Sequence, residues 1–356
     1  MEKKIVTGLF LFLVVFALSS IFFYLRGEKD YFNKNGLVEQ KDVVNVVVSR
    51  STDMIDLFVK GTIDGFLMAH PIAADAVLNN EDAEYFIHSS EIWPNHPGST
   101  LSAITEDEEI ILALVWAHVK ATQFINDSSN EKKIIEYGMD FTGQSENVIR
   151  ESLKHTKHTE FPSQTATKEF LEIMIDEGVI LNTPLEQGYA SSDDFLNDFL
   201  NDYYYKDVIK NLENNPQWKP SFVEKSVKVG YVENVLTYMT AYVASKEGYY
   251  DEVFADIELI GFLNAPSTID AYNAGLIDAA YSGIGGSITK VFNGELPIFI
   301  IGGGNAEGQS LVVRNNIKMK NDFIGRTIAS DRPGTTPYFL LRMFFNENEL
   351  VHEIEK

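Results

Sequence analysis

Short apolar runs alternate with amphipathic segments along the chain from residue 42 onward. The valine-rich run at residues 42–49 predicts a buried strand. The segment at 52–61 predicts a helix, which Thr52 or Asp53 can cap. The run "IDGFLMAHP" at 63–71 predicts a second strand. Strand, helix and strand in this order form a βαβ unit, whose right-handed crossover makes the two strands parallel.

A second βα series follows a helical middle region. Residues 105–205 predict mainly helices, and the polar segment 213–221, which contains two prolines, predicts a linker. Beyond the linker we expect strands at 227–232, 257–262, 276–283, 296–304, 310–314 and 326–330, with helices at 234–247, 266–275, after 283 and at 337–349. The pattern therefore predicts an α/β fold, in which ligand sites lie where strands end in glycine-rich turns.

One phrase occurs twice, near the start and near the end of the chain. Residues 60–71 read "KGTIDGFLMAHP" and residues 274–285 read "AGLIDAAYSGIG". Both contain glycine, one other residue, isoleucine and aspartate, followed by a small residue and an apolar run. The repetition raises the question of whether the chain contains two equivalent units.

The N-terminus carries an apolar segment long enough to cross a membrane. Residues 5–25 contain no charge, and Lys3 and Lys4 precede them. About 20 apolar residues suffice to span a bilayer as a helix, and flanking lysines favour the cytoplasmic side. We expect an uncleaved membrane anchor that places the remaining chain outside the cytoplasm. A cleaved signal peptide is the alternative, although "ALSS" is a poor cleavage site.

Composition excludes several classes of function. The chain of 356 residues has a formal net charge of −23, and no local cluster of lysine or arginine offsets it. Such a surface repels phosphates, so we expect no nucleic-acid partner. The sequence contains no cysteine, which removes thiol nucleophiles, disulfides, cysteine-ligated metals and a lipid-modified cysteine.

Few residues form a recognisable chemical motif. The segment 302–308 ("GGGNAEG") lacks the G-K-[ST] of a phosphate-binding loop, and we interpret it as a turn or ligand-facing loop. We interpret His155 and His158 as part of a solvated helix. His70 and His96 each precede a proline, where ligand contact and simple turn structure are both open. No catalytic triad, carboxylate pair or metal signature is present, so we expect no enzyme, cofactor or metal.

The turn at 332–339 ("RPGTTPYF") is more informative. Its glycine allows close backbone approach, its threonines can cap a helix, and Pro337 fits the first helical position. Exposed N–H groups at such a helix end accept an anion or a polar ligand oxygen. Because "YSG" at 281–283 forms a second strand-to-helix turn, these residues indicate a binding protein.

The motifs resemble the substrate-binding proteins of ABC importers, of the nitrate, sulfonate, taurine and thiamine-precursor type. The phrases that carry the resemblance include "VKVGYVENVL", "FLNAPSTIDAYNAGLIDAAYSG", "FIGRTIASDRPGTTPYFLLRMFF" and "DVVNVVVSRSTDMIDLFVKGTIDGFLMAHP". Together with shorter phrases they cover nearly all of residues 37–350. The resemblance implies a two-lobe periplasmic-binding-protein-like (Venus flytrap) α/β fold, with solute in the cleft and the repeated phrase once in each lobe.

The order of the phrases differs from that family. A typical member starts with the phrase found here at 227 and reaches the 333–345 phrase before the one at 42–48. The chain therefore resembles a circularly permuted member, or one cut from a tandem array. Permutation predicts that residues 346–356 lie beside residues 37–44, because old termini must be close.

The resemblance also implies a domain organisation and a set of partners. Residues 1–26 form the anchor or signal, 37–100 with 323–356 the lobe with the PGTT turn, 101–212 a helical segment packed on the other lobe, 213–226 the linker, and 227–322 the main part of the other lobe. The expected function is capture of a small polar or anionic solute outside the cytoplasm and its delivery to an ABC permease and ATPase. A membrane-anchored sensing or scaffold domain without a transport role is the alternative.

By position, the resemblance implies ten solute-binding residues. From one lobe these are Tyr231, Asn234, Asn264, Ser282 and Gly283, and from the other Gly334, Thr335, Thr336, Asp53 and His70. Pyrimidine synthases with a similar fold are a rival, but those enzymes work in the cytoplasm and depend on a cysteine cluster, and this chain has no cysteine.

Overall fold

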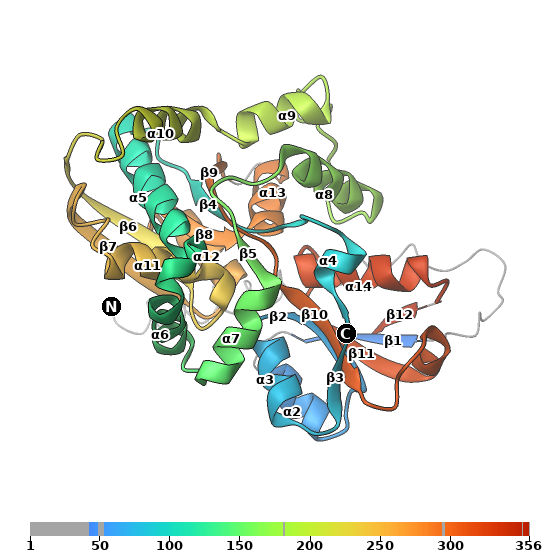
Figure 1. Cartoon of the computed structure of the whole chain (residues 1–356). Helices are drawn as coiled ribbons and strands as arrows, with labels where there is room; N and C mark the ends of the chain where they lie inside the picture. Colours follow the sequence, from blue (N-terminus) through green and yellow to red (C-terminus); the bar gives the residue numbers. More distant parts are fainter. Residues whose placement is uncertain (1–42, 49–52, 181, 294–295, 351, 356) are drawn as a thin grey trace, which may run out of the picture. The chain divides into compact units, whose positions relative to one another are not determined.

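The computed structural model describes residues 43–48, 53–180, 182–293, 296–350 and 352–355. Lys41–Lys356 form one compact unit with two six-stranded sheets, A and B (Figure 1). Sheet A has the order β12-β1-β11-β2-β10-β3 and sheet B the order β5-β9-β4-β8-β6-β7. The fold is thus α/β with two sheets, as the sequence predicts.

The strands of sheet A are β1 (Val43–Val47), β2 (Gly65–Ala69), β3 (Ala83–His88), β10 (Gln309–Arg314), β11 (Arg326–Ser330) and β12 (His352–Glu355). Those of sheet B are β4 (Pro97–Ala103), β5 (Thr156–His158), β6 (Val223–Val232), β7 (Phe254–Phe262), β8 (Ala279–Gly283) and β9 (Phe299–Glu307). In sheet A, β10 runs antiparallel to β2 and β3. In sheet B, β4 runs antiparallel to β8 and β9. The chain passes from sheet A to sheet B after β3 and returns after β9.

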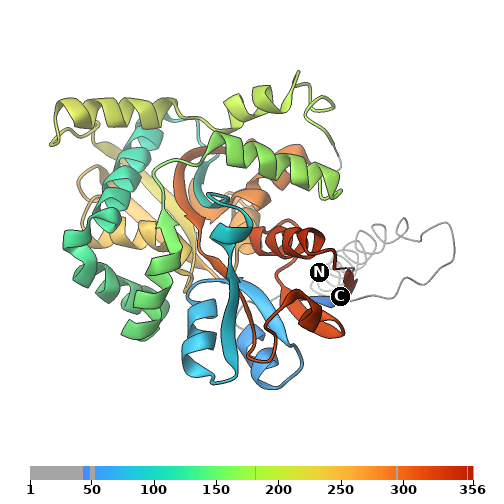
Figure 2. The same ribbon diagram turned by 45° about the vertical axis from the view of Figure 1, so that its right-hand side comes forward.

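Thirteen α-helices are described. Those that accompany sheet A, here called lobe A, are α2 (Asp53–Val59), α3 (Ile72–Asn79), α4 (Ser89–Ile92) and α14 (Thr336–Glu347). Those that accompany sheet B, here called lobe B, are α5 (Glu108–Asn126), α6 (Glu131–Thr142), α7 (Glu146–His155), α10 (Tyr203–Asn214), α11 (Met239–Lys246), α12 (Ala265–Asn273) and α13 (Ile284–Phe292). The remaining two, α8 (Gln164–Asp176) and α9 (Ser192–Phe199), lie along one side of the molecule (Figure 2).

The repeated phrase serves the same structural purpose in both lobes. In lobe A, the Asp64 carboxylate accepts the backbone N–H of Thr327 on β11 at 3.0 Å. In lobe B, the Asp278 carboxylate accepts the backbone N–H of Lys228 on β6 at 2.8 Å. The backbone N–H of each aspartate donates in return to the carbonyl of the same partner residue. Each aspartate therefore joins the strand that follows it to a neighbouring parallel strand, β11 in sheet A and β6 in sheet B.

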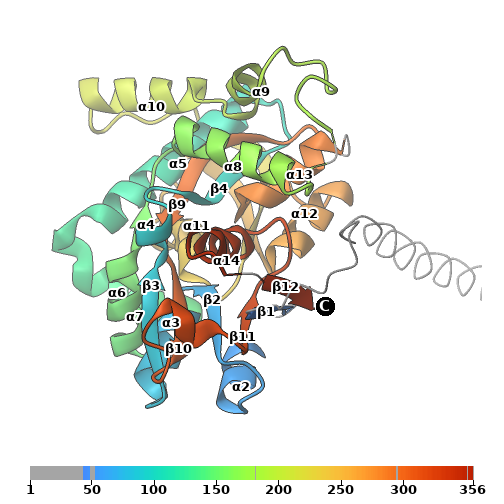
Figure 3. The ribbon, with the colours of Figure 1, turned by 90° about the vertical axis from the view of Figure 1, so that its right-hand side faces the viewer.

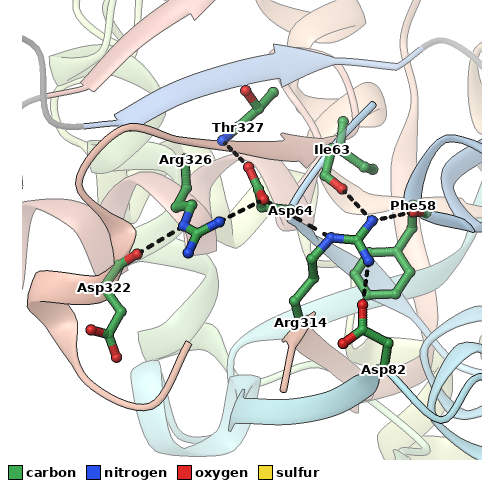
Figure 4. Close-up of polar contacts among 8 residues, drawn as sticks. All are labelled: Phe58, Ile63, Asp64, Asp82, Arg314, Asp322, Arg326 and Thr327. Carbon is green, nitrogen blue, oxygen red and sulfur yellow. Dashed lines mark hydrogen bonds and ion pairs between the residues drawn. The ribbon is translucent and has the colours of Figure 1, made fainter. Parts of the chain in front are cut away.

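Lobe A adds ion pairs to this arrangement. Asp64 also accepts from Arg326 at 3.1 Å and lies 4.0 Å from Arg314 (Figure 4). Arg314 in turn pairs with Asp82 and donates to the carbonyl oxygens of Phe58 and Ile63. Hydrogen bonds to charged groups are worth more than neutral ones, so this network holds four segments of lobe A together.

A shared apolar core connects the two lobes. Phe170 of α8 packs edge to face on Phe339 of α14 with ring centroids 5.3 Å apart, and it also contacts Trp93 near α4. The same cluster of buried residues includes Ile284 and Ile288 of α13. Because α14 contacts strands of sheet A and α13 those of sheet B, helix α8 contacts both lobes.

The two ends of the described chain meet at the edge of sheet A. Strand β12 pairs in parallel with β1, with Val43 opposite His352 and Val44 opposite Glu353 (Figure 3). This agrees with the expected neighbourhood of residues 346–356 and 37–44, of which 37–42 lie outside the described residues. Strand β10 belongs to sheet A, although the expected boundary at 322 assigned it to the other lobe.

Other expectations differ in detail from the structure. The helix expected from 234 begins at Met239, after a 3₁₀ turn at Leu236–Tyr238, because Asn234 has a left-handed backbone with φ of 61°. The solvated helix expected around His158 is wrong. Residues 156–158 form strand β5 against β9, and His158 is buried. The expected anchor at 5–25 lies outside the described residues, and no described helix is long and apolar enough to span a membrane.

Replacing Asp64 by asparagine should destabilise the protein, because an amide cannot accept from both arginines and Thr327. We expect Asp64→Asn to lower the free energy of unfolding by about 1.5–3 kcal/mol, measured by urea denaturation. Asp278→Asn should cost less, because the amide oxygen can still accept from Lys228. Asp56→Asn is the control, since Asp56 is 77% exposed and, among the described residues, pairs with Lys60 alone at 3.9 Å. Equal effects at Asp64 and Asp56 would contradict the role of this network.

Candidate functional site

The ends of the central strands in the two lobes face each other through two helix N-termini. Helix α13 follows β8 in lobe B, and α14 follows β11 in lobe A. A Cβ added to Gly285, in the first turn of α13, would lie 2.2 Å from the carbonyl oxygen of Gly334, just before α14. Only glycine at 285 permits this contact. Gly334 has φ of +92°, a conformation that also favours glycine.

Three residues from both lobes lie near this contact, and we call them the interlobe group: Tyr238, Gly283 and Asp331. Apart from the residues next to it in the chain, the Tyr238 hydroxyl is the described group that a Cβ added at Gly283 would approach within 4 Å, at 3.9 Å. Gly283 therefore borders open space. The negative charge of Asp331, from lobe A, reaches Tyr238, because after burial it is the second cause that raises the pKa of this phenol above its usual range.

Asp331 is a half-buried carboxylate in the turn before α14. One of its oxygens accepts the backbone N–H of Arg332 at 2.8 Å. Burial raises the pKa of the carboxyl above its ordinary value, and the N–H and positive charge of Arg332 lower it only in part. Within the described residues, no lysine, arginine or histidine lies within ion-pair distance of Asp331. A functional site is a common location for such a group.

The expected threonines of lobe A lie next to this group. The Thr335 hydroxyl donates to the carbonyl of Arg332 at 2.8 Å, which closes the turn before α14. The buried Thr336 hydroxyl donates to the carbonyl of Pro97, the first residue of β4 in lobe B, at 3.3 Å. Neither side chain caps α14. The PGTT turn is thus attached to the other lobe.

The expected residues of lobe B divide into two sets. Ser282 and Gly283 lie at the site, and the buried Ser282 hydroxyl has no hydrogen-bond partner among the described atoms. By contrast, Asn264 caps helix α12 by accepting from Ser267, and the Tyr231 ring packs on Phe141 of α6 at 5.8 Å. Asn234 is exposed at the left-handed turn after β6. In the described structure these last three residues form no hydrogen bond or ring contact with the interlobe group.

The last two expected residues of lobe A, Asp53 and His70, have no described contact with the interlobe group. Asp53 is the first residue of α2, directly after residues 49–52, which the structure does not describe. His70 is fully buried, and its Nε2 lies 3.0 Å from the Ser310 hydroxyl. The same hydroxyl lies 2.8 Å from Nδ1 of His88. His70 therefore contacts β10 at the place where the chain passes between the two sheets, after β3 and again before β10.

A histidine cluster forms at these crossings, and the sequence did not predict it. The His155 ring stacks on His88 with centroids 4.0 Å apart and on His70 at 5.1 Å. Glu151 lies 3.1 Å from His155. Burial and the neighbouring histidines lower the pKa of His70 and His88. Stacked rings do not converge on one point, and no group of three metal-binding side chains occurs in the described ranges.

Sequence reasoning missed Tyr238 and Asp331 as site residues. Tyr238 precedes α11 by one residue and looks like an ordinary helix residue. Asp331 lies just before the turn at 332–339. An acidic residue next to a turn that is expected to bind anions was the signal that could have pointed to it. Two hollows, of about 380 and 330 Å³, lie instead among the helical segments of lobe B, around Tyr205 and around His158.

Asp331→Asn should stabilise the protein in the absence of solute. Because burial raises the pKa of Asp331, the folded state binds its proton more tightly than the unfolded state does, so ionisation lowers stability as pH rises through the raised pKa. The asparagine oxygen can still accept from Arg332. We expect the variant to gain up to about 1 kcal/mol at pH 7 and less at pH 4, measured by urea denaturation. A loss of stability at pH 7 would show that Asp331 serves the fold.

Comparison with known proteins finds a family model that matches part of the chain. Residues 14–138 match the sequence model of the NMT1-like family, of the ABC substrate-binding type. The match covers 125 of the 356 residues. A comparison with proteins of curated function finds no match.

Solved structures of solute-binding proteins are similar at a low level. They include OppA from Haemophilus influenzae in complex with a peptide (11% identity, TM-score 0.32, 77% of this chain and 55% of that one). A peptide-binding protein AppA from Clostridium difficile gives 10% identity and a TM-score of 0.31, over 78% of this chain and 58% of that one. The substrate-binding domain of an oligopeptide ABC transporter from Bacillus anthracis gives 11% and 0.29, over 75% and 53%. The chain spans little more than half the length of these proteins, and such similarity says nothing about its solute.

Proposed function

We propose that this chain is an extracytoplasmic solute-binding protein, which holds a small solute between its lobes and delivers it to an ABC importer. The observation that supports this most is the interlobe group. Two sheets with the same aspartate connection direct their central strand ends toward one place, where Gly283 borders open space. In open α/β sheets, ligands bind outside the carboxyl ends of strands. The match to the NMT1-like family supports the same function.

The sequence also favours a type of importer and a mode of attachment to the membrane. The quoted phrases favour the nitrate, sulfonate, taurine and thiamine-precursor branch. The apolar segment 5–25 would anchor the chain, because the sequence has no cysteine to carry a lipid. In this arrangement the binding unit stays close to the permease.

We also propose that the segment order is a circular permutation. In lobe B the chain runs from β6 through α11 to β7, which is the neighbour of β6. The corresponding path in lobe A runs from β11 through α14, but the neighbour of β11 is β1, from the start of the chain. Strand β12 pairs on the outer side of β1. The observed connections agree with an ancestral link from α14 to β1.

One observation favours the alternative of a sensing or scaffold domain. Wide opening of the lobes would expose Phe170 and Phe339 in the core shared by α8, α13 and α14. Arg342 of α14 also pairs with Glu177 at the end of α8 at 2.5 Å. A protein whose lobes stay together binds solute with little closure, which suits a sensor as well as a transport receptor.

Thermal unfolding of the full chain with candidate solutes tests the proposed function. The panel contains nitrate, sulfonates, bicarbonate, amino acids and pyrimidines. A solute at a hundred times its dissociation constant adds about 2.7 kcal/mol, or roughly 5 °C for a unit of this size. Gly283→Leu should abolish the shift by filling the open space, since Gly283 has φ of −67° and accepts a side chain. Gly286→Ala is the matched control, because its Cβ meets only Ile269 at 3.6 Å. A shift that survives in Gly283→Leu would place the solute elsewhere.

A rearranged chain tests the permutation. Residues 221–350 followed directly by 39–220 contain three residues after α14 and four before β1, so the new connection has seven residues. The link from α11 to β7 in lobe B, residues 247–253, has the same length. We expect cooperative unfolding with a Tm within about 5 °C of a control chain in the original order that lacks 1–38 and 351–356. Failure of the rearranged chain alone to unfold cooperatively would refute the permutation.

A further inference from the structure

Imidazole rings from both lobes stack on one another where α7 of lobe B meets lobe A. His155, the last residue of α7, lies face to face with His88 of β3, with ring centroids 4.0 Å apart and an angle of 17° between the rings. Its ring also stacks on His70 at 5.1 Å and 19°. Helix α7 packs on α3 as well, which begins two residues after His70. These three histidines, the histidine cluster, are therefore part of the contact between the lobes.

One hydroxyl group positions the two histidines of lobe A. Ser310 of β10 lies 3.0 Å from Nε2 of His70 and 2.8 Å from Nδ1 of His88. A hydroxyl has a single proton, so between neutral rings it donates to one nitrogen and accepts from the other. The Tyr85 ring contacts His88 at 4.9 Å and His155 at 5.6 Å. Lobe A thus holds its two rings in place, and His155 joins them from the other lobe.

The groups around the cluster compensate only part of the charge that protonation adds. On the neighbouring described elements these groups are Glu151 and Lys154 of α7, Asp75 of α3, Tyr85 of β3, Glu91 of α4 and Lys157 of β5. Glu151 lies 3.1 Å from Nε2 of His155, but it also pairs with Lys154 at 2.7 Å. Burial and the charge of His155 lower the pKa of His88, and the two glutamates, Glu91 and Glu151, raise it only in part.

We propose that the histidine cluster is a proton-sensitive latch, which keeps α7 on lobe A while its rings are neutral and releases it in an acidic medium. Protonated rings 4.0 Å apart repel each other, and separation of the lobes lets water solvate them. Protonation of histidine clusters changes interfaces in this way in pH-sensing proteins. The inference goes beyond the proposed function, because the latch acts on the lobes themselves and does not depend on a solute.

Proton linkage gives the direction of the effect. In the described, closed state, burial and the neighbouring histidines lower the pKa of His70 and His88. In an open state, with α7 away from lobe A, a histidine in water titrates at about 6.5. The open state therefore binds more protons as the pH falls through about 6.5, and its population grows. One extra proton raises the ratio of open to closed molecules about tenfold between pH 7.5 and 5.5.

A distance measurement between two spin labels, one on each lobe, tests the latch. The chain has no cysteine, so Val59→Cys on α2 and Lys132→Cys on α6, both exposed positions, take the labels selectively. In the full chain we expect the ratio of a longer distance to the closed one to rise about tenfold or more between pH 7.5 and 5.5. The helical circular dichroism should stay constant. His155→Phe keeps a stacked ring that cannot be protonated, and its rise should be at least about threefold smaller.

Two further variants separate the latch from general effects of acid. His155→Gln, which also cannot be protonated, should show the same reduced rise as His155→Phe. Lys154→Gln is the matched control, because it removes a positive charge from the same turn of α7 outside the stack and should keep the full rise. Cooperative urea unfolding at pH 7.5 shows that each variant is folded.

Three results would overturn the inference. The first is an unchanged distance in the wild-type chain down to pH 5.5. The second is a rise in both His155 variants equal to that of the wild type, or one that Lys154→Gln reduces as strongly. The third is a loss of helical circular dichroism together with the longer distance. Acid would then unfold the chain through other buried histidines, such as His118 and His158, whose pKa burial lowers to about 4.

Discussion

The structure depends on one backbone connection that occurs twice. In each lobe an aspartate after a helix bonds to the neighbouring parallel strand through both its carboxylate and its backbone N–H. A parallel pair of strands needs a crossover, so their register is not set by a tight turn. The aspartates set it instead, with Ile328 opposite Gly65 in one sheet and Val229 opposite Ala279 in the other. The strands that follow these aspartates, β2 and β8, are thereby fixed in register, and β8 ends at Gly283 of the site.

The site depends on two glycines, which have no side chain to fill the space between the lobes. Gly285 allows the first turn of α13 to contact the backbone of Gly334, which brings the two helix N-termini together. Gly283 leaves space that the Tyr238 hydroxyl borders. A glycine-rich strand end thus serves two needs, close approach of the lobes and room for a solute. Asp331 adds a carboxylate next to the PGTT turn, where it accepts the backbone N–H of Arg332.

The contacts between the lobes differ in kind on different sides of the site. Around α8 they are apolar and extensive, with Phe170 and Phe339 at their centre. At the crossings of the chain they are aromatic and titratable, through the stacked rings of His88 and His155 and the shared Ser310 hydroxyl. If the lobes move relative to each other, they either keep both groups of contacts, the apolar and the histidine ones, or break one of them. This constraint will determine how far the site can open.

The sequence by itself determined most of the strands and helices, because valine-rich runs, capping residues and helix-stopping glycines are local signals. It also determined the two-unit architecture, since Asp64 and Asp278 stand in the same phrase. Strand β4 begins at a proline and contains small polar residues, so no local pattern marked it. Of the site, the glycine turns could be predicted, because each requires a particular backbone geometry. The placement of Tyr238 near Asp331, and of His70 against His155, was decided only by tertiary structure. These pairs are distant in sequence, and only the packing of two lobes brings them together.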